Sequence, residues 1–332
     1  MLDKNLPEES KRLAENIAEQ FKLERDKEFT FLLVGRSGVG KSSTANSLMG
    51  KEIAPVGKFE PTTMTVERYK SEIGGVKFTI IDTPGLCDDL EEKGNDYEYL
   101  DRIRLNTNRI DLMWFVTELG ESRVLSDEKR GIKLISEAFN PKIWEQAIIV
   151  FTCADKVSPE EYPEFLEKRT ELIRKEISKY SGIAIANNIP SIAVSNIKEF
   201  TPDGERWIGE LYTQVYTRMA REGAGAFFMS TVERIKPPKS EPEIVEKIVY
   251  VPSPTPTAPP IYLNERQAGI VRNRTVDIII QSTEAGAVAG QMIGKAIGSI
   301  GGPVVSEVLG KGGEVVGGTV GALVGVWKGI FG

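Results

Sequence analysis

The chain has 332 residues, 40% of them hydrophobic and 27% charged, a composition typical of a globular protein with one α/β domain and an additional segment. Its formal net charge of -6 argues against nucleic acid as the main partner, because a phosphate backbone attracts clustered Lys and Arg. Histidine is absent and only two cysteines occur, which excludes Ser-His and Cys-His nucleophile systems and most zinc sites and indicates a reducing compartment.

Residues 1–27 predict an N-terminal helix. Leu13, Ile17 and Phe21 recur at every fourth position, as on the apolar face of an amphipathic helix that packs on the following domain. The segment is densely charged and has no apolar run of signal-peptide length, so we expect a cytoplasmic location.

Residues 28–235 form one expected domain, in which short β-rich runs alternate with helical stretches. This alternation predicts a three-layer α/β fold, with a mainly parallel sheet and helices on both faces. Gly74 and Gly75 predict a hairpin that makes one sheet edge antiparallel. The expected strands are 29–34, 65–72, 76–81, 111–116, 147–152 and 191–194, and the expected helices are 41–49, 96–108, 127–139, 159–179 and 205–221.

A glycine-rich loop, Gly35 to Ser42, lies between the first expected strand and the helix that follows it. In a P-loop of this kind, backbone N–H groups and the helix N-terminus bind nucleotide phosphates. Lys41 is expected to reach the β- and γ-phosphate oxygens, and Ser42 to ligate Mg²⁺. The predicted phosphate-binding residues are Arg36, Ser37, Gly38, Val39, Gly40, Lys41, Ser42 and Ser43.

The third expected strand leads into a second motif, DTPG, from Asp82 to Gly85. We expect the strand to deliver Asp82 to the phosphate edge of the sheet, where its carboxylate holds Mg²⁺ through water and the Gly85 N–H contacts the γ-phosphate. The loop between the two motifs is rich in threonine. Thr63 is the first candidate, and Thr65 the second, for a hydroxyl that closes over Mg²⁺.

The fifth expected strand is followed by Thr152, Cys153, Ala154 and Asp155, where GTPases carry Asn-Lys-x-Asp. A carboxylate there accepts hydrogen bonds from the N1–H and the exocyclic amine of guanine, which adenine does not offer. Thr152 and Asp155 are therefore the expected base-binding residues, with GTP and GDP as ligands. The alternatives are a helix cap at Asp155 and a P-loop protein that uses ATP.

The order of these motifs resembles the AIG-type G domains of septin-like GTPases, the group of GIMAP proteins and plant chloroplast Toc receptors. The resemblance rests on GRSGVGKSSTANSLMG, FTIIDTPGL, FVTELG and ESRVLSDEKRGIKLISEAFNPKIWEQAIIVFTCAD, within residues 1–220. It implies binding of GTP or GDP with Mg²⁺, a base-contacting loop at Ser195 and Asn196, and a homodimer across the nucleotide face.

Hydrolysis of GTP is expected to be slow. Ras-like enzymes orient the attacking water with a glutamine after the second motif, and this chain has Leu86 there. The resemblance implies that dimerisation compensates, because members present an arginine from the loop after the fourth strand, a position that Arg123 matches. Arg36 is the second candidate. The alternative to this dimerising GTPase switch is a nucleotide-gated assembly scaffold with little hydrolysis.

A proline-rich linker at 236–262 precedes a C-terminal region at 263–332. Residues 264–281 predict a helix, and two series of glycines at every fourth position then predict a glycine-zipper helical hairpin. The series are Gly286, Gly290, Gly294, Gly298 and Gly302, then Gly317, Gly321, Gly325 and Gly329. Three uses remain open: attachment to a membrane, which the resemblance favours, self-association, or folding back onto the G domain.

Overall fold

The computed structural model describes residues 22–54, 67–83, 101, 104, 109–236 and 258–282. The chain divides into two compact units, one formed by Asp26–Phe227 and the other by Met1–Arg25 with Phe228–Gly332. Most of the expected N-terminal helix, most of the helix expected at 96–108, most of the linker and both glycine series lie outside the described residues.

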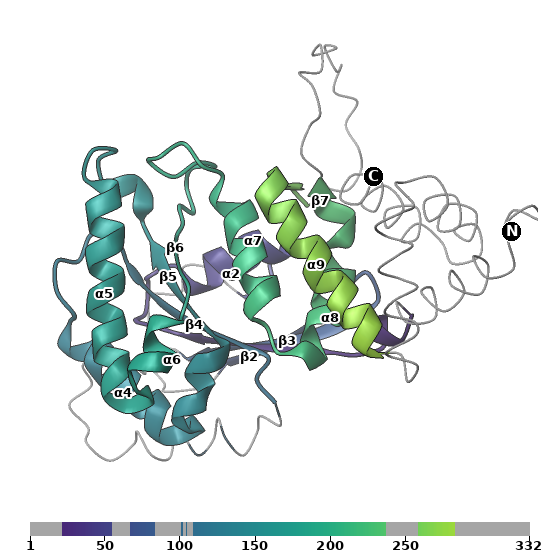
Figure 1. Cartoon of the computed structure of the whole chain (residues 1–332), viewed down its shortest axis with the longest axis horizontal. Coiled ribbons are helices and arrows are strands. Elements are labelled where there is room, and N and C mark those ends of the chain that lie inside the picture. The colour runs from purple at the N-terminus through teal and green to yellow at the C-terminus, as the bar shows by residue number, and fades with distance from the viewer. Residues whose placement is uncertain are drawn as a thin grey trace, which may run out of the picture. The chain divides into compact units, whose positions relative to one another are not determined.

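The first unit is built on a six-stranded sheet with the strand order β2-β3-β1-β4-β5-β6 (Figure 1). Neighbouring strands are parallel except β2 and β3, which form an antiparallel hairpin across Gly74 and Gly75. The expected α/β fold with a mainly parallel sheet is therefore confirmed. The strands are β1 (Phe29–Val34), β2 (Glu67–Ile73), β3 (Val76–Thr83), β4 (Leu112–Glu118), β5 (Ala147–Thr152) and β6 (Ser191–Ala193).

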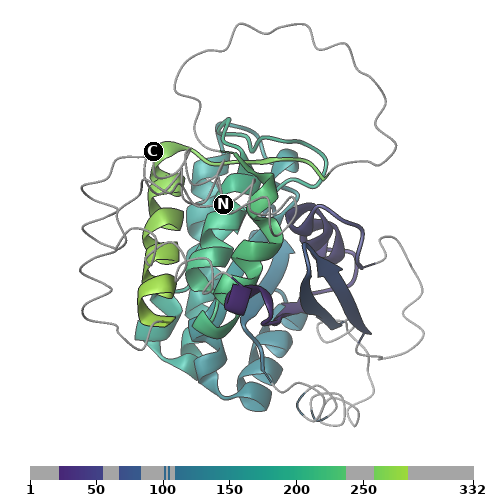
Figure 2. The same ribbon diagram turned by 90° about the vertical axis from the view of Figure 1, so that its right-hand side faces the viewer.

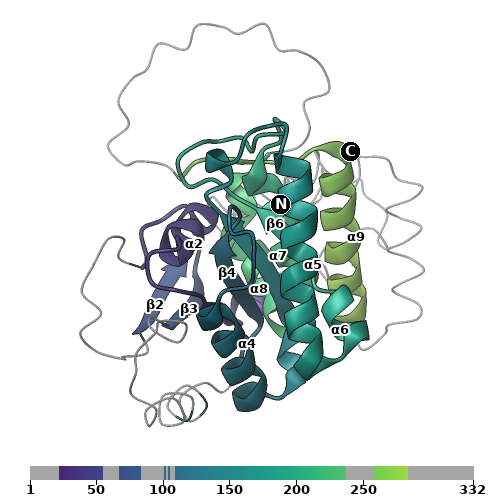
Figure 3. The same ribbon diagram turned by 90° about the vertical axis from the view of Figure 1, so that its left-hand side faces the viewer.

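One face of the sheet packs against α4 (Ser126–Phe139) and α5 (Tyr162–Ser181), which lie side by side in Figure 3. Successive side chains of a strand point to opposite faces, so Leu32 and Val34 of β1 and Phe115 of β4 belong to this layer. The helices contribute Ile132, Ile135, Ile173 and Ile177 to the same buried cluster. The apolar spacing of both helices thus fixes their position over the sheet.

α7 (Trp207–Arg218) covers the opposite face (Figures 1 and 2). A cluster of aromatic rings that includes Tyr212 of α7 lies in this layer. Phe29 of β1 stacks on Phe78 of β3 with ring centroids 5.1 Å apart. Phe227 meets Phe29 at 5.7 Å and Tyr212 at 5.4 Å. Such pairs stabilise by roughly 0.5–1.5 kcal/mol beyond their buried area. The central strand that leads into the glycine-rich loop is therefore held firmly on both faces.

α7 confirms the helix expected at 205–221, although it ends three residues earlier than expected. α7 ends at Arg218, Met219 has an extended backbone with φ -58 and ψ 142, and α8 (Arg221–Thr231) begins after it. At the break, Ala220 N donates a hydrogen bond to Asp111 O at 2.7 Å. No glycine or proline marks the break in the sequence, because its cause is a contact with a distant segment.

The described part of the second unit contains a short parallel pair, β7 (Ile235–Lys236) and β8 (Ile261–Tyr262), followed by α9 (Glu265–Ser282). α9 confirms the helix expected at 264–281. It begins with a reciprocal cap, in which Asn264 N donates to Gln267 Oε1 at 2.9 Å and Gln267 N donates to Asn264 Oδ1 at 3.0 Å. Among the described helices of the chain, none has the length and apolar character needed to cross a membrane.

Candidate functional site

The candidate site residues gather at one edge of the sheet because β1, β3, β4, β5 and β6 are parallel to one another. Parallel strands bring their carboxyl ends to the same edge, and open α/β sheets bind ligands there. At this edge lie the glycine-rich loop after β1, Asp82 in β3, Arg123 after β4, Asp155 after β5 and Ser195 after β6.

The loop after β1 requires glycine at two positions. A Cβ atom on Gly35 would lie 2.2 Å from the carbonyl oxygen of Val116, so only glycine allows β1 to end this close to β4. Gly40 has a φ of +94, in the left-handed region that glycine adopts without strain. α2 (Lys41–Met49) follows directly, and in the described structure no side chain caps it. Its first N–H groups are therefore available to an anion.

Lys41, Ser42 and Asp82 form a polar cluster beside this loop. Lys41 is 6% exposed, and its Nζ donates to Gly35 O at 3.0 Å and to Arg36 O at 2.8 Å. Ser42 Oγ donates to Asp82 Oδ2 at 2.9 Å, while Asp82 Oδ1 lies 3.7 Å from Lys41 Nζ. Among the described residues this buried Oδ1 has no hydrogen-bond partner. A hydroxyl beside an unsatisfied carboxylate oxygen fits Mg²⁺, which prefers oxygen ligands.

The loop after β5 presents Asp155 on a sharp turn. Cys153 has a left-handed backbone with φ 57, and the short helix η2 (Ala154–Lys156) follows. Ser195 is fully buried, and its Oγ donates to Asp155 Oδ1 at 2.7 Å and accepts from Lys198 N at 3.0 Å. The serine therefore fixes the direction of the Asp155 carboxylate.

Asn196 and Thr152 contact other parts of the same unit. Asn196 Nδ2 donates to Thr44 Oγ1 at 3.0 Å, and Thr44 Oγ1 donates to Gly40 O at 2.9 Å. Thr152 Oγ1 donates to Thr117 O of β4 at 3.3 Å. These contacts join the loops after β5 and β6 to the start of α2 and to β4. The expected contacts of both residues with a base stay predictions.

The two candidate arginines have different surroundings. Arg36, 43% exposed, forms an ion pair in which its Nε lies 2.8 Å from Oδ2 of Asp127 in the first turn of α4. Arg123 is exposed, and its guanidinium has no partner among the described residues. A second molecule can therefore reach Arg123 without breaking a contact within the described part of the chain.

A buried ion pair that the sequence motifs do not reveal lies beside Arg123. Arg169 of α5 and Glu128 of α4 are 1% and 2% exposed, and Arg169 Nη2 donates to Glu128 Oε1 at 2.5 Å. Arg169 Nη1 also donates to Arg123 O at 2.8 Å. The only local hint in the sequence is a glutamate in the first turn of α4, a position typical of helix capping.

Four residues with expected roles lie outside the described residues, and those roles stay predictions: Thr63, Thr65, Gly85 and Leu86. Within the described ranges, no group of three or more Asp, Glu, Cys or His side chains could hold a metal ion.

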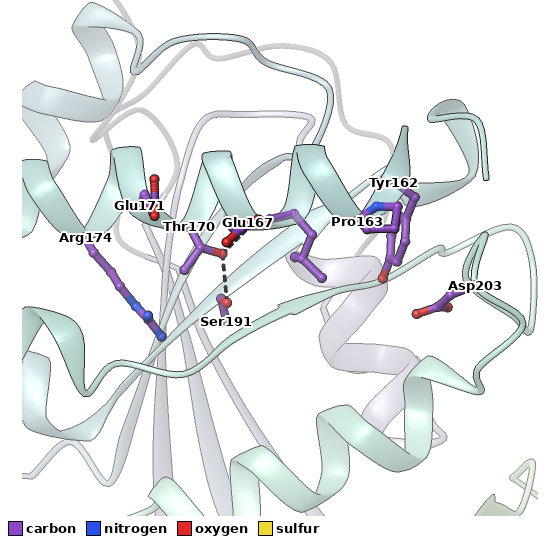
Figure 4. A pocket seen from close by; sticks show the side chains of 9 residues that line it. Tyr162, Pro163, Glu167, Thr170, Glu171, Arg174, Ser191 and Asp203 are labelled. Atoms are coloured by element: carbon purple, nitrogen blue, oxygen red, sulfur yellow. Dashed lines mark hydrogen bonds between the residues drawn. The ribbon is translucent and has the colours of Figure 1, made fainter. Parts of the chain in front are cut away.

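A pocket of about 520 Å³ lies between α5, the start of β6 and the loop that contains Asp203 (Figure 4). Thr170 Oγ1 donates to Ser191 Oγ at 2.9 Å in its wall. Burial, with a smaller contribution from the charge of Asp203, raises the pKa of Tyr162 to about 12. None of the candidate nucleotide-binding residues lines this pocket. Its lining consists of Tyr162, Pro163, Leu166, Glu167, Thr170, Glu171, Arg174, Ser191 and Asp203.

Comparison with known proteins agrees with this geometry. Residues 29–190 match the model of the AIG1 family. The chain is 30% identical over 224 residues to translocase of chloroplast 34 of Pisum sativum, an alignment that covers 60% of this chain and 68% of that protein. It is 32% identical over 199 residues to translocase of chloroplast 33 of Arabidopsis thaliana, covering 55% of this chain and 66% of that one.

Among solved structures, the fold is similar to Toc33 of Arabidopsis thaliana in a dimerisation-deficient arginine-to-alanine form. The TM-score is 0.50 at 27% sequence identity, and the alignment covers 64% of this chain and 92% of that chain. The family match begins at β1 and ends beside β6, so it contains the glycine-rich loop, Asp82, Arg123 and Asp155. The chain belongs to the AIG1 family.

Proposed function

We propose that this protein binds GTP and GDP with Mg²⁺ and hydrolyses GTP slowly, as a switch that dimerises according to the bound nucleotide. The observation that carries the proposal is the cluster of Lys41, Ser42 and Asp82 beside the glycine-rich loop, with the buried Asp82 Oδ1 lacking a hydrogen-bond partner among the described residues. This set combines the three functions that a bound nucleoside triphosphate needs: a cation for the phosphates, a hydroxyl and a carboxylate for the metal.

The residues of this cluster have distinct roles. The ammonium group of Lys41, now held by two loop carbonyls, would turn to the β- and γ-phosphate oxygens. Ser42 and Asp82 would hold Mg²⁺, Asp82 through water, with Thr63 as the expected third oxygen ligand. When bound, the metal neutralises charge on the phosphates during transfer. The free N–H groups at the start of α2 and the expected contact from Gly85 complete the phosphate site.

Guanine specificity depends on Asp155. Its carboxylate, oriented by Ser195, would accept two hydrogen bonds from the guanine edge. Thr152, Ser195 and Asn196 border the same loops, where they can support the base through backbone or side-chain groups. A competition between GTP and ATP distinguishes this proposal from an ATP-dependent P-loop protein.

A dimer supports hydrolysis in this proposal because Leu86 cannot orient water as glutamine does. The exposed Arg123 of one molecule would stabilise the charge that develops at the γ-phosphate of its partner, with Arg36 as the second candidate. The similar solved structure supports this role, because it is a form of Toc33 in which the replacement of an arginine by alanine makes the protein deficient in dimerisation.

The test is the rate of GTP hydrolysis per site as a function of protein concentration. The proposal predicts a rate that rises with concentration, and a larger oligomer with a non-hydrolysable GTP analogue than with GDP.

A specific observation also favours a second candidate function: Leu86 would permit a nucleotide-gated scaffold that assembles with GTP and hardly hydrolyses it. Assembly without any rise in the rate would support that scaffold.

The location that we propose is the cytoplasmic face of a membrane. The relatives named above are chloroplast translocases, which associates this family with a membrane process. In this proposal the glycine series at 286–302 and 317–329, outside the described residues, provide the attachment. Self-association and folding back onto the G domain remain the alternative uses of that region.

A further inference from the structure

Residues 119–125, here called the β4–α4 loop, carry Arg123 and are tied to the domain at both ends. At the start, Leu119 N donates to Thr152 O at 3.0 Å. At the end, Leu125 N donates to Glu128 Oε2 at 2.8 Å, which also caps α4. The remaining anchor lies in the middle of the loop, at the carbonyl group of Arg123 itself.

Arg169 supplies that anchor with a guanidinium group whose donors are almost all used. Nη1 donates to Arg123 O at 2.8 Å, and Nε donates to Glu118 O at 3.4 Å. Nη2 donates to Thr117 Oγ1 at 3.0 Å and to Glu128 Oε1. A planar guanidinium has five N–H groups in fixed directions, so one side chain serves acceptors on β4, the loop and α4 together. The three N–H groups of a lysine ammonium lie too close together to reach all of these acceptors at once.

The position of the β4–α4 loop depends on the Arg169–Glu128 ion pair because both side chains are buried. Arg169 and Glu128 are almost fully buried, and buried charges are tolerated only when they are paired and hydrogen-bonded. Glu128 accepts from Arg169, from the Thr117 hydroxyl and from Leu125 N. The pair is therefore fully satisfied only when the β4–α4 loop occupies its observed place, which favours one conformation of the loop.

The same turn of α4 contacts the glycine-rich loop. Asp127, the neighbour of Glu128, pairs with Arg36 at 2.8 Å. The glycine-rich loop and the β4–α4 loop thus share one anchor, the first turn of α4. The backbone carbonyl of Arg123 is thus held in place. Its side chain is exposed and has no partner among the described residues.

We infer that Arg169 is a positioning residue, which with Glu128 holds the β4–α4 loop so that Arg123 is presented to the nucleotide of a second copy of this chain. The inference rests on the proposed function, in which Arg123 acts across a dimer. Arg169 touches neither nucleotide nor metal in this role. Its effect through Arg123 is exerted on the site of the partner molecule, and a general loss of structure, or a change carried to its own glycine-rich loop by the Asp127–Arg36 pair, would not produce that asymmetry.

A mixed single-turnover experiment on the full chain uses this asymmetry. One protein is loaded with GTP, and an excess of a second protein, the helper, is loaded with a non-hydrolysable GTP analogue. Wild type and Arg169→Lys are each tested as the GTP-loaded protein and as the helper. The lysine keeps a positive charge beside Glu128 but lacks the planar set of N–H donors of the guanidinium group. Arg174→Lys is the matched control, since Arg174 lies on the same helix and also donates to a backbone carbonyl, that of Ile189.

The expected result is that Arg169→Lys fails as helper and succeeds as the GTP-loaded protein. As helper it should lower the rate on the order of 100-fold, the effect of misplacing a reacting group by about 1 Å. With wild-type helper, GTP-loaded Arg169→Lys should hydrolyse at the wild-type rate, and Arg174→Lys should behave as wild type in both positions. An Arg169→Lys helper as active as wild type overturns the inference, and so does a GTP-loaded Arg169→Lys that stays slow with wild-type helper.

A double variant, Arg169→Met with Glu128→Gln, tests the same contact without leaving a buried charge. Replacing both partners of a buried ion pair by well-packed hydrophobic residues is often neutral for stability, and the glutamine here keeps an acceptor oxygen for Leu125 N. This variant should also fail as helper, and normal helper activity would overturn the inference. If the wild-type protein alone shows no rise in rate with concentration, the proposed function fails first and the inference fails with it.

Discussion

At the scale of single residues, the Asp82 carboxylate has one oxygen bound to Ser42 and the other buried without a hydrogen-bond partner among the described residues. Asp82→Asn should lower the affinity for GDP by about 10- to 100-fold in the presence of Mg²⁺, since it removes a charged group that holds the metal. The affinity measured in EDTA should change much less, because no metal is then bound.

Titration of GDP by calorimetry, with and without Mg²⁺, measures this difference. Asp203→Asn is a suitable control, because Asp203 is also an aspartate of this unit but lines the separate pocket. Equal losses for Asp82→Asn in Mg²⁺ and in EDTA would show that this carboxylate does not act through a metal.

Asp155 and Ser195 form the second residue-scale prediction. Asp155→Asn should weaken GTP binding by about 3 kcal/mol, or roughly 100-fold, because it replaces a charged acceptor of two hydrogen bonds. Ser195→Ala should weaken it by only about 1 kcal/mol, since the carboxylate remains but loses the hydroxyl that orients it. Competition of GTP against ATP measures both effects, and an unchanged preference in Asp155→Asn would contradict the assignment.

At the scale of elements, the first turn of α8 packs closely against Asp111 at Gly223. A Cβ atom there would lie 2.7 Å from Cγ and 2.8 Å from Oδ1 of Asp111. Asp111 is fully buried, its pKa is raised by that burial, and its carboxylate is held by Thr30 N at 2.8 Å and Arg109 Nε at 2.7 Å. The carboxylate therefore cannot move away without breaking contacts with β1 and Arg109.

Gly223→Ala should destabilise the protein by about 1–3 kcal/mol, the usual effect of overpacking. Gly269→Ala in α9 should instead raise the free energy of unfolding by up to about 1 kcal/mol, because no atom lies within 4 Å of the added Cβ and alanine favours a helix. Urea unfolding of both variants measures the contrast. Destabilisation of equal size in both would contradict a local clash at Asp111.

Local patterns in the sequence predict most elements of the first unit. Apolar runs predict the strands, and the glycine-rich loop predicts the turn between β1 and α2, because each depends on neighbouring residues. The break at Met219 could not be predicted, because it follows from a contact with Asp111. For the same reason the sequence predicts Asp155 as a candidate but not its contact with Ser195. It suggests Glu128 as a capping residue of α4 but not the pairing of Glu128 with Arg169.

At the scale of the whole molecule, the central question is whether two copies share one catalytic event. Arg123→Ala should lower GTP hydrolysis at high protein concentration while leaving nucleotide affinity nearly unchanged. An arginine supplied by a partner raises the hydrolysis rate by a factor on the order of 10³ or more. Most of the concentration-dependent rise in rate should therefore disappear. Lys129→Ala, which removes an exposed cation in α4, is the matched control. An unaltered rate per site in Arg123→Ala would reject the role of this arginine.

Attachment to a membrane is the other property of the whole chain that can be measured directly. The full chain and a form ending at Lys236 should partition differently with liposomes, because only the full chain contains the two glycine series and the apolar residues between them. The nucleotide site lies before Lys236, so the rate of GTP hydrolysis at low concentration checks that the shorter form is folded. Equal partitioning of two active forms would exclude the membrane role, and concentration-dependent self-association of the full chain alone would favour the glycine series as a contact between copies.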